Sequence, residues 1–200
     1  MFSKRHKKIL LVTGSIASGK SFICKQINKK NISYVDLDKV VNQIYEKNIN
    51  FKNKLLSIDV SLIKKDKINK NNVKNAVSKN PKLLDFLEQS IYPILKSKLD
   101  LLLKESEDLL FIIEVPLLFE KNFTINFSYR TINVFCSRLI HRKRLSSRFS
   151  QSTNLFKNII LKRHYSQEKK SIYSDEFINS CCNGRLNNLL IEILLSKYLN

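Results

Sequence analysis

The sequence has few of the features that mark secreted, metal-binding or membrane proteins. Its 200 residues carry no C-x-x-C pair, and the four cysteines have no metal-ligand spacing with the three histidines; the cysteines are Cys24, Cys136, Cys181 and Cys182. Reduced thiols in a cytoplasm are the expected state. No apolar run approaches the length of a membrane span, and the basic start precedes too short an apolar run for a signal peptide. We therefore expect a cytoplasmic protein with no membrane association.

Acidic residues are also scarce. Asp and Glu number 17 against 36 Lys and Arg, which gives a formal net charge of +19. The lysines are spread along the chain instead of forming a patch with arginines and aromatics, so a solvated basic surface is favoured and no nucleic-acid partner is expected. Such a field would still gather polyanionic substrates. A nucleic-acid-binding ATPase remains the alternative that the charge suggests.

The strongest motif is a phosphate loop near the start of the chain. It matches G-x-x-x-x-G-K-[ST] and follows an apolar run at 9–13 that is typical of a buried strand. Helical spacing of apolar residues follows it, which makes a chance Gly/Ser turn the weaker interpretation. Backbone N–H groups of such a loop bind polyphosphate, Lys20 can reach the β- and γ-phosphates, and Ser21 can ligate Mg²⁺. The predicted ATP contacts are Gly14, Ser15, Ile16, Ala17, Ser18, Gly19, Lys20 and Ser21.

Four further runs are predicted to be strands, at 32–35, 109–115, 131–135 and 175–178, with a terminal helix at 186–199. The run at 109–115 is nearly continuously apolar, as in a strand buried on both faces. Residues 39–103 show helical periodicity and no strong strand, which predicts an all-helical insertion. The apolar residues after the third strand, Pro116, Leu117 and Leu118, are predicted to line a pocket, with ordinary core as the alternative.

Two carboxylates follow the second strand. Asp36 and Asp38 would face the crevice at the carboxyl edge of a parallel sheet, where α/β proteins bind ligands. There they could receive a proton or hold Mg²⁺. The alternative is that Asp38 caps a helix beginning at Lys39. Both can hold, with Asp36 functional and Asp38 capping.

Basic residues dominate two predicted helices after the fourth strand, at 138–148 and 155–163. Arg144 and Arg148 stand at i and i+4 and share a face. Joined by a short turn, the two helices would make a lid whose guanidinium groups neutralise charge on a transferring phosphoryl group. A solvated basic face is the alternative.

In this order the motifs resemble those of the dephospho-CoA kinase family, whose members phosphorylate the 3′-hydroxyl of dephospho-CoA with ATP in the last step of coenzyme A synthesis. The matching segments are Thr13–Ser21 for the phosphate loop, Val35–Asp38 for an Asp-x-Asp, Leu87–Pro93 for a Leu-Glu…His-Pro, Val115–Glu120 for a Pro-Leu-Leu-Phe-Glu, and Arg144 with Arg148. A kinase for another small hydroxylated acceptor is the alternative within enzymes.

The resemblance implies a three-layer α/β/α fold of the P-loop kinase type, with a five-stranded parallel sheet, a helical CoA-binding insert and a helical lid. The 200 residues would form a single P-loop kinase unit. Its core would span about 1–40, 106–137 and 168–200, the insert about 41–105, and the lid about 138–167.

The resemblance also implies roles for individual residues. Lys20, Asp36 and Arg148 would be catalytic, Arg144 would join the loop in binding ATP, and Ser21 would ligate Mg²⁺. The acceptor contacts would be Asp36, Tyr92, Pro116, Leu117 and Leu118. ATP and dephospho-CoA would be the partners of a monomer or small homo-oligomer.

The chain departs from the family pattern at several positions. Ser15 and Ala17 replace glycines, which is a mild change if their φ angles need not be positive. Tyr92 replaces a histidine and could keep a hydrogen bond but no charge at neutral pH. Phe149 stands where aspartate is common, and the family's asparagine near the C-terminus is either displaced to Asn179 or lost.

Overall fold

The computed structural model describes residues 7–27, 31–65, 67–150, 154–181 and 184–199. It divides into two compact units. The first, here called the sheet unit, comprises Met1–Asp36, Ser106–Gln151 and Leu161–Asn200. The second, the helical unit, comprises Leu37–Glu105 and Ser152–Ile160.

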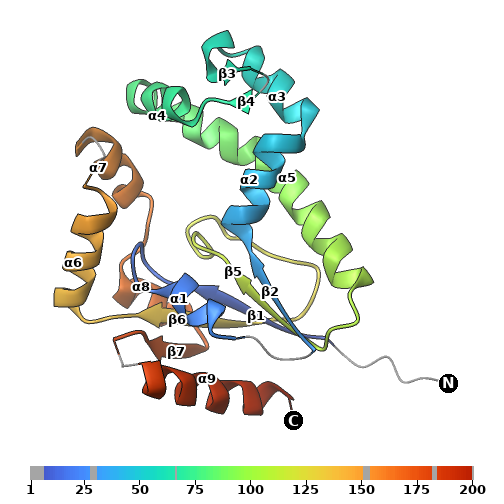
Figure 1. Ribbon diagram of the computed structural model, residues 1–200, viewed down its shortest axis with the longest axis vertical. Helices are drawn as coiled ribbons and strands as arrows, with labels where there is room; N and C mark the ends of the chain where they lie inside the picture. The colour runs from blue at the N-terminus through green and yellow to red at the C-terminus, as the bar shows by residue number, and fades with distance from the viewer. Residues whose placement is uncertain (1–6, 28–30, 66, 151–153, 182–183, 200) are drawn as a thin grey trace. The chain divides into compact units, whose positions relative to one another are not determined.

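The sheet unit is built on five parallel strands in the order β2-β5-β1-β6-β7 (Figure 1). The strands are β1 (Lys8–Thr13), β2 (Ile32–Asp36), β5 (Leu110–Glu114), β6 (Arg130–Phe135) and β7 (Glu176–Asn179). This confirms the predicted five-stranded sheet. All five residues of β5 are buried, as its continuous apolar run predicted.

Helices cover both faces of this sheet. On one face α1 (Lys20–Lys25) and α9 (Gly184–Leu199) pack against alternate strand residues such as Leu10, Ile112 and Val134. Because neighbouring strand residues point to opposite faces, Asn133 lies on the other face. There its amide nitrogen donates to Ser171 Oγ at 2.9 Å, on α8 (Gln167–Tyr173). The three layers are therefore α1 with α9, the sheet, and α8.

The sequence patterns did not predict α8. Its apolar residues Ile172 and Tyr173 are 80% and 56% exposed, and its buried residue is Lys170. Gln167, the first residue of α8, bonds to the residue that follows β6. The Gln167 side chain accepts from the Cys136 amide at 2.8 Å and donates to the Cys136 carbonyl at 3.1 Å. Burying a polar face and exposing an apolar one inverts the pattern by which amphipathic helices are found.

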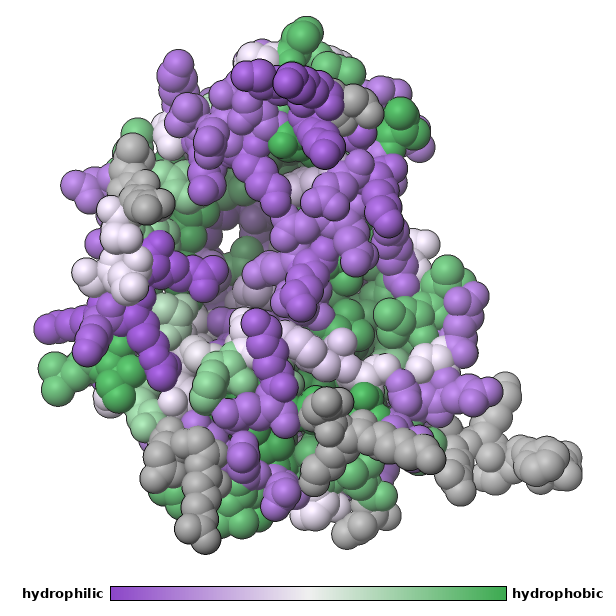
Figure 2. Space-filling model, in the orientation of Figure 1, coloured by the Kyte–Doolittle hydropathy of each residue, from purple (hydrophilic) through white to green (hydrophobic). Residues whose placement is uncertain are grey.

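The helical unit contains α2 (Leu37–Lys47), α3 (Ile49–Leu56), a 3₁₀ turn (Val60–Leu62), α4 (Lys70–Lys79) and α5 (Lys82–Glu105), with most of α7 (Asn154–Lys162). Its longest helix buries one residue every four: Leu83, Leu87, Ile91, Leu95, Leu99 and Leu103. In the face shown in Figure 2, hydrophilic residues cover most of these helices, and hydrophobic ones appear in scattered patches.

Two expectations for this region were wrong. The insertion is not all-helical, because β3 (Ile63–Lys64) pairs with β4 (Lys67–Ile68) in an antiparallel ladder. Two residues a strand are too few to show any periodicity. Asp38 does not cap a helix beginning at Lys39, because α2 begins at Leu37 and Asp38 lies in its first turn.

The bounds of the other predicted strands and helices differ from the observed ones by at most two residues. The first lid helix, α6 (Arg138–Arg148), has the predicted bounds, and the polar break after it falls partly on residues 151–153, outside the described part of the chain. β7 begins one residue after Asp175, whose carboxylate instead accepts the Thr131 amide and hydroxyl, both at 2.7 Å. Among the described helices, none combines the length and apolar character that crossing a membrane would require.

Candidate active site

The phosphate loop leaves β1 and enters α1 through backbone conformations that favour glycine. Gly14 has φ 154° and Gly19 has φ 99°. A Cβ on Gly14 would lie 2.4 Å from the Val134 carbonyl oxygen, a backbone atom that cannot move aside. Ala17 also lies in the left-handed region, at φ 61°, whereas Ser15 does not. The replacement of glycine is therefore mild at Ser15 and strained at Ala17.

Lys20 folds back over the loop, and its side chain is buried. Its Nζ donates to the carbonyl oxygens of Gly14 and Ser15, both at 2.9 Å. The residue is 8% exposed. The ammonium group is thus held at the rim of the loop, where polyphosphate would bind.

Ser21 is the first member of a hydrogen-bonded chain that the sequence did not predict. Its Oγ donates to Glu114 Oε1 at 2.7 Å, and Tyr34 Oη donates to Glu114 Oε2 at 2.7 Å. Glu114 is 4% exposed at the end of β5, and Asp36 is its register partner at the end of β2. Burial, and then the bond to Glu114, raise the pKa of the Tyr34 phenol. Glu114 could have been recognised in the sequence as a candidate site residue, because it is an acidic residue at the end of an otherwise apolar strand.

Arg144 lies against the loop from α6. Its Nη1 donates to Ser18 O at 3.3 Å and to Ser180 Oγ at 3.0 Å, and its Nη2 donates to Ser180 O at 3.3 Å. Ser180 Oγ itself donates to Ser18 O. Asn179, the displaced asparagine, instead accepts the Cys181 amide at 2.9 Å. Arg144 and Ser180 therefore support the back of the loop.

His141 supports the loop as well. Its Nε2 lies 2.7 Å from the Ile16 carbonyl oxygen and 3.2 Å from Ser15 Oγ. A carbonyl oxygen only accepts, so the ring donates from Nε2. His141 was missed in the sequence, although its spacing of three and seven residues from Arg144 and Arg148 places all three on one helix face.

Arg148 is exposed at the last position of α6. Its charge is close enough to act on His164, a partly buried residue that follows α7. Burial, and then the positive charges of Lys170, Lys20, Arg148 and Arg163, lower the pKa of His164 to about 3. These four cations of the sheet unit thus lie near enough to His164 to favour its neutral form.

The residues expected to contact the acceptor lie in different surroundings. Pro116 and Leu117 follow β5 and are partly exposed, whereas Leu118 is 2% exposed. Leu118 therefore packs in the interior, and the first two keep surface for a ligand. Tyr92 lies on α5 in the helical unit and is partly exposed.

Comparison with known proteins identifies the family. The sequence model of the dephospho-CoA kinases matches residues 8–184. The chain belongs to the dephospho-CoA kinase family. The dephospho-CoA kinase of Rickettsia prowazekii is 32% identical over 170 residues, which span 84% of this chain and 86% of that protein. The dephospho-CoA kinase of Gamma-proteobacterium EBAC31A08 is 30% identical over 195 residues, which span 96% and 97%.

Solved structures show the same fold. The crystal structure of TT1252 from Thermus thermophilus has a TM-score of 0.76 at 21% identity and covers 96% of this chain, with 98% of its own length matched. A dephospho-CoA kinase from Campylobacter jejuni has a TM-score of 0.64 at 21% identity, covering 96% of each chain. The fold is therefore that of P-loop kinases, to which the sheet order and loop also point.

Ala17 gives a testable consequence of its departure from the family's glycine. A non-glycine residue in the left-handed region costs about 1–2 kcal/mol, and glycine's extra unfolded-state entropy offsets about half of the gain. We expect Ala17→Gly to raise the free energy of unfolding by about 0.5–1 kcal/mol in urea titrations. The chain's other alanine, Ala76, lies in α4, where the same substitution should lower stability by about 1 kcal/mol. A destabilising effect at position 17 would contradict the strain argument.

Proposed function

We propose that this chain is an ATP-dependent phosphotransferase that phosphorylates the 3′-hydroxyl of dephospho-CoA, giving coenzyme A and ADP. The observation that carries the proposal is that the phosphate loop, which follows β1, and Asp36, the last residue of β2, stand at the same carboxyl edge of one parallel sheet. This edge is where open α/β sheets bind ligands. Family membership over residues 8–184 supports dephospho-CoA as the acceptor.

Catalysis of this kind depends on positioning and on charge neutralisation. The loop N–H groups hold the ATP phosphates, and the ammonium of Lys20 turns from the carbonyls of Gly14 and Ser15 to the β- and γ-phosphates. Arg144 keeps the loop in shape, and Arg148 neutralises charge that develops on the transferring group. Asp36 accepts a hydrogen bond from the 3′-hydroxyl and orients it for attack.

The residues around Ser21 fit a magnesium ion. Mg²⁺ prefers oxygen ligands and is usually held by one or two protein groups together with substrate phosphates. The Ser21 hydroxyl, with the Glu114 carboxylate 2.7 Å behind it and Asp36 on the next strand, provides such a set. A magnesium ion held there by Ser21, Glu114 and Asp36 would supply positive charge that offsets the charge of the ATP phosphates.

A panel assay on purified protein tests the proposal. Radiolabelled ATP is offered with dephospho-CoA, shikimate, a nucleoside monophosphate or an oligonucleotide, and labelled product is quantified. We expect labelled coenzyme A and no comparable product with the other acceptors. Preference for another small acceptor, or ATP hydrolysis stimulated by the oligonucleotide with a steep salt dependence, would favour an alternative.

Arg148 offers a further prediction. We expect Arg148→Ala to lower kcat with dephospho-CoA by about 10²-fold or more, because a guanidinium that neutralises the transferring phosphoryl group is lost. Since Arg148 is exposed, the melting temperature should hardly change. Arg138→Ala is the matched control, because Arg138 begins the same helix and its side chain is 85% exposed beside Glu168. If Arg148→Ala were as active as Arg138→Ala, Arg148 would not belong to the active site.

A further inference from the structure

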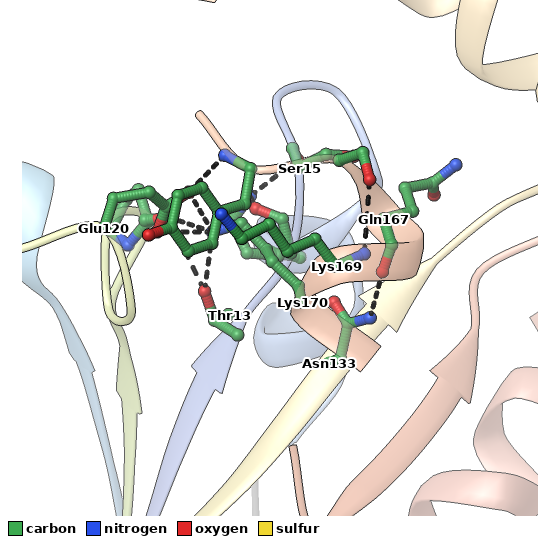
Figure 3. Close-up of polar contacts among 12 residues, drawn as sticks. Thr13, Ser15, Glu120, Asn133, Gln167, Lys169 and Lys170 are labelled. Carbon is green, nitrogen blue, oxygen red and sulfur yellow. Dashed lines mark hydrogen bonds and ion pairs between the residues drawn. The ribbon is translucent and has the colours of Figure 1, made fainter. Parts of the chain in front are cut away.

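Lys170 is a fully buried charge that the proposed mechanism does not use. It projects from α8 toward the phosphate loop side of the sheet unit, and its side chain is 0% exposed where it meets Glu120, itself 3% exposed (Figure 3). Burial lowers the pKa of its ammonium group, and the neighbouring Glu120 carboxylate opposes that shift. A buried ion pair is weak grounds for stability, because desolvation offsets most of the attraction. A role other than stabilising the fold is therefore needed to explain this buried ion pair.

All three protons of this ammonium group are directed at acceptors. Nζ donates to Pro116 O at 2.7 Å, to Thr13 Oγ1 at 3.1 Å, and to the Glu120 carboxylate, whose Oε1 lies at 2.9 Å. An ammonium group has three N–H donors, so its capacity is fully used. The three acceptors fix its position from three directions.

The acceptors belong to the two segments that the proposed reaction must align. Thr13 is the last residue of β1 and directly precedes Gly14 of the phosphate loop. Pro116 and Glu120 bound the segment after β5 that is proposed to contact the acceptor. Glu120 Oε1 also accepts the Tyr165 amide at 2.7 Å, so the chain returning from α7 is anchored at the same carboxylate.

We infer that Lys170 is a positioning residue for phosphoryl transfer, holding the start of the phosphate loop and the 116–120 segment in fixed register through its bonds to Thr13, Pro116 and Glu120. The inference rests on the proposed kinase function. Reactive groups must be placed closely for in-line transfer, and a misplacement of about 1 Å can cost 10²-fold in rate. Lys170 touches neither substrate and acts through these two segments.

Replacement of Lys170 by methionine tests this role, with its exposed neighbour as control. We expect Lys170→Met to lower kcat at saturating ATP and dephospho-CoA by about 10- to 100-fold per folded molecule. The dissociation constant of ADP should change by less than about threefold, because Arg144 and His141 still support the loop. Lys169→Met removes a lysine that lies 3.6 Å from the Tyr165 ring centroid and should leave kcat unchanged.

A double variant separates positioning from charge compensation. Lys170→Met leaves the Glu120 carboxylate buried without its cation, which should lower the melting temperature. Adding Glu120→Gln removes the unpaired charge, so the melting temperature should recover. We expect kcat to stay low, because the two Lys170 bonds that join Thr13 to Pro116 are still missing and only the 3.5 Å hydrogen bond from Thr13 Oγ1 to the Pro116 carbonyl remains. Recovery of kcat together with the melting temperature would overturn the inference.

Thr13→Val keeps the test decisive if Lys170→Met does not fold. Valine preserves the shape of this fully buried side chain and removes the hydroxyl that Lys170 binds, together with the 3.5 Å bond from that hydroxyl to the Pro116 carbonyl. A lower kcat with ADP affinity retained supports the inference, and an unchanged kcat overturns it. The wild-type protein is assayed alongside. If the wild type does not phosphorylate dephospho-CoA, the proposed function is wrong. If the wild type is active and the variants keep its kcat, only the role of Lys170 is wrong.

Discussion

Replacing Lys20 by methionine is expected to lower turnover of dephospho-CoA by about 10²- to 10³-fold, the usual cost of losing one preorganised electrostatic contact to a transition state. The ammonium is held at the loop rim by the carbonyls of Gly14 and Ser15, both at 2.9 Å. Methionine keeps the apolar stem of this largely buried side chain, so folding should be preserved. The loss should therefore fall on kcat and on nucleotide affinity.

The measurements are steady-state kinetics and fluorescence titration with a labelled ADP, with circular dichroism to verify folding. Lys25→Met is the matched control, because Lys25 is exposed at the end of the same short helix. Its kinetics should equal those of the wild type. If Lys20→Met bound ADP and turned over normally, the loop could not be the phosphoryl-donor site.

Asp36→Asn is expected to have a comparable effect on turnover, about 10²- to 10⁴-fold, the range for removing a carboxylate that handles the proton of an acceptor hydroxyl. Asparagine has nearly the same shape and can still accept one hydrogen bond, so what is lost is charge and basicity. ADP affinity measured without Mg²⁺ should be retained, because the loop is untouched. The expected signature is a low kcat with normal nucleotide binding.

Asp38→Asn is the control for this prediction. Asp38 lies two residues further along, in the first turn of α2, where its negative charge interacts favourably with the helix dipole. We expect its kcat to remain within about threefold of the wild type. A loss at position 38 as large as that at position 36 would mean that the Asp-x-Asp acts as a pair, and the assignment of these roles to Asp36 alone would then be wrong.

Local pattern predicted much of the sheet unit. Four of the five predicted strands have a short-range signal in their apolar runs, and the phosphate loop has one in Gly14 and Gly19 at fixed spacing. α6 was predicted from Arg138 to Arg148, and those are its bounds. Such features depend on neighbours along the chain, and a single sequence contains that information.

Contacts between distant residues could not be predicted in the same way. Lys170 meets Thr13, 157 residues earlier, and Arg144 meets Ser18 at a separation of 126. α8 went unrecognised because the side chain it buries is a lysine, which a hydropathy pattern reads as solvent-facing. Glu114 likewise gains its partners Ser21 and Tyr34 only when β1, β2 and β5 assemble. These side chains take their roles from tertiary pairing.

The Ser21, Glu114 and Tyr34 chain also limits where a proton can travel. Both outer members are hydroxyl donors, and both point at the carboxylate between them, at 2.7 Å each. Because burial and this bond raise the pKa of the Tyr34 phenol, its proton stays in place at neutral pH. A carboxylate that receives from two sides cannot pass a proton from one side to the other. The Glu114 chain therefore does not serve as a proton path in this arrangement, which is consistent with the assignment of the acceptor hydroxyl to Asp36.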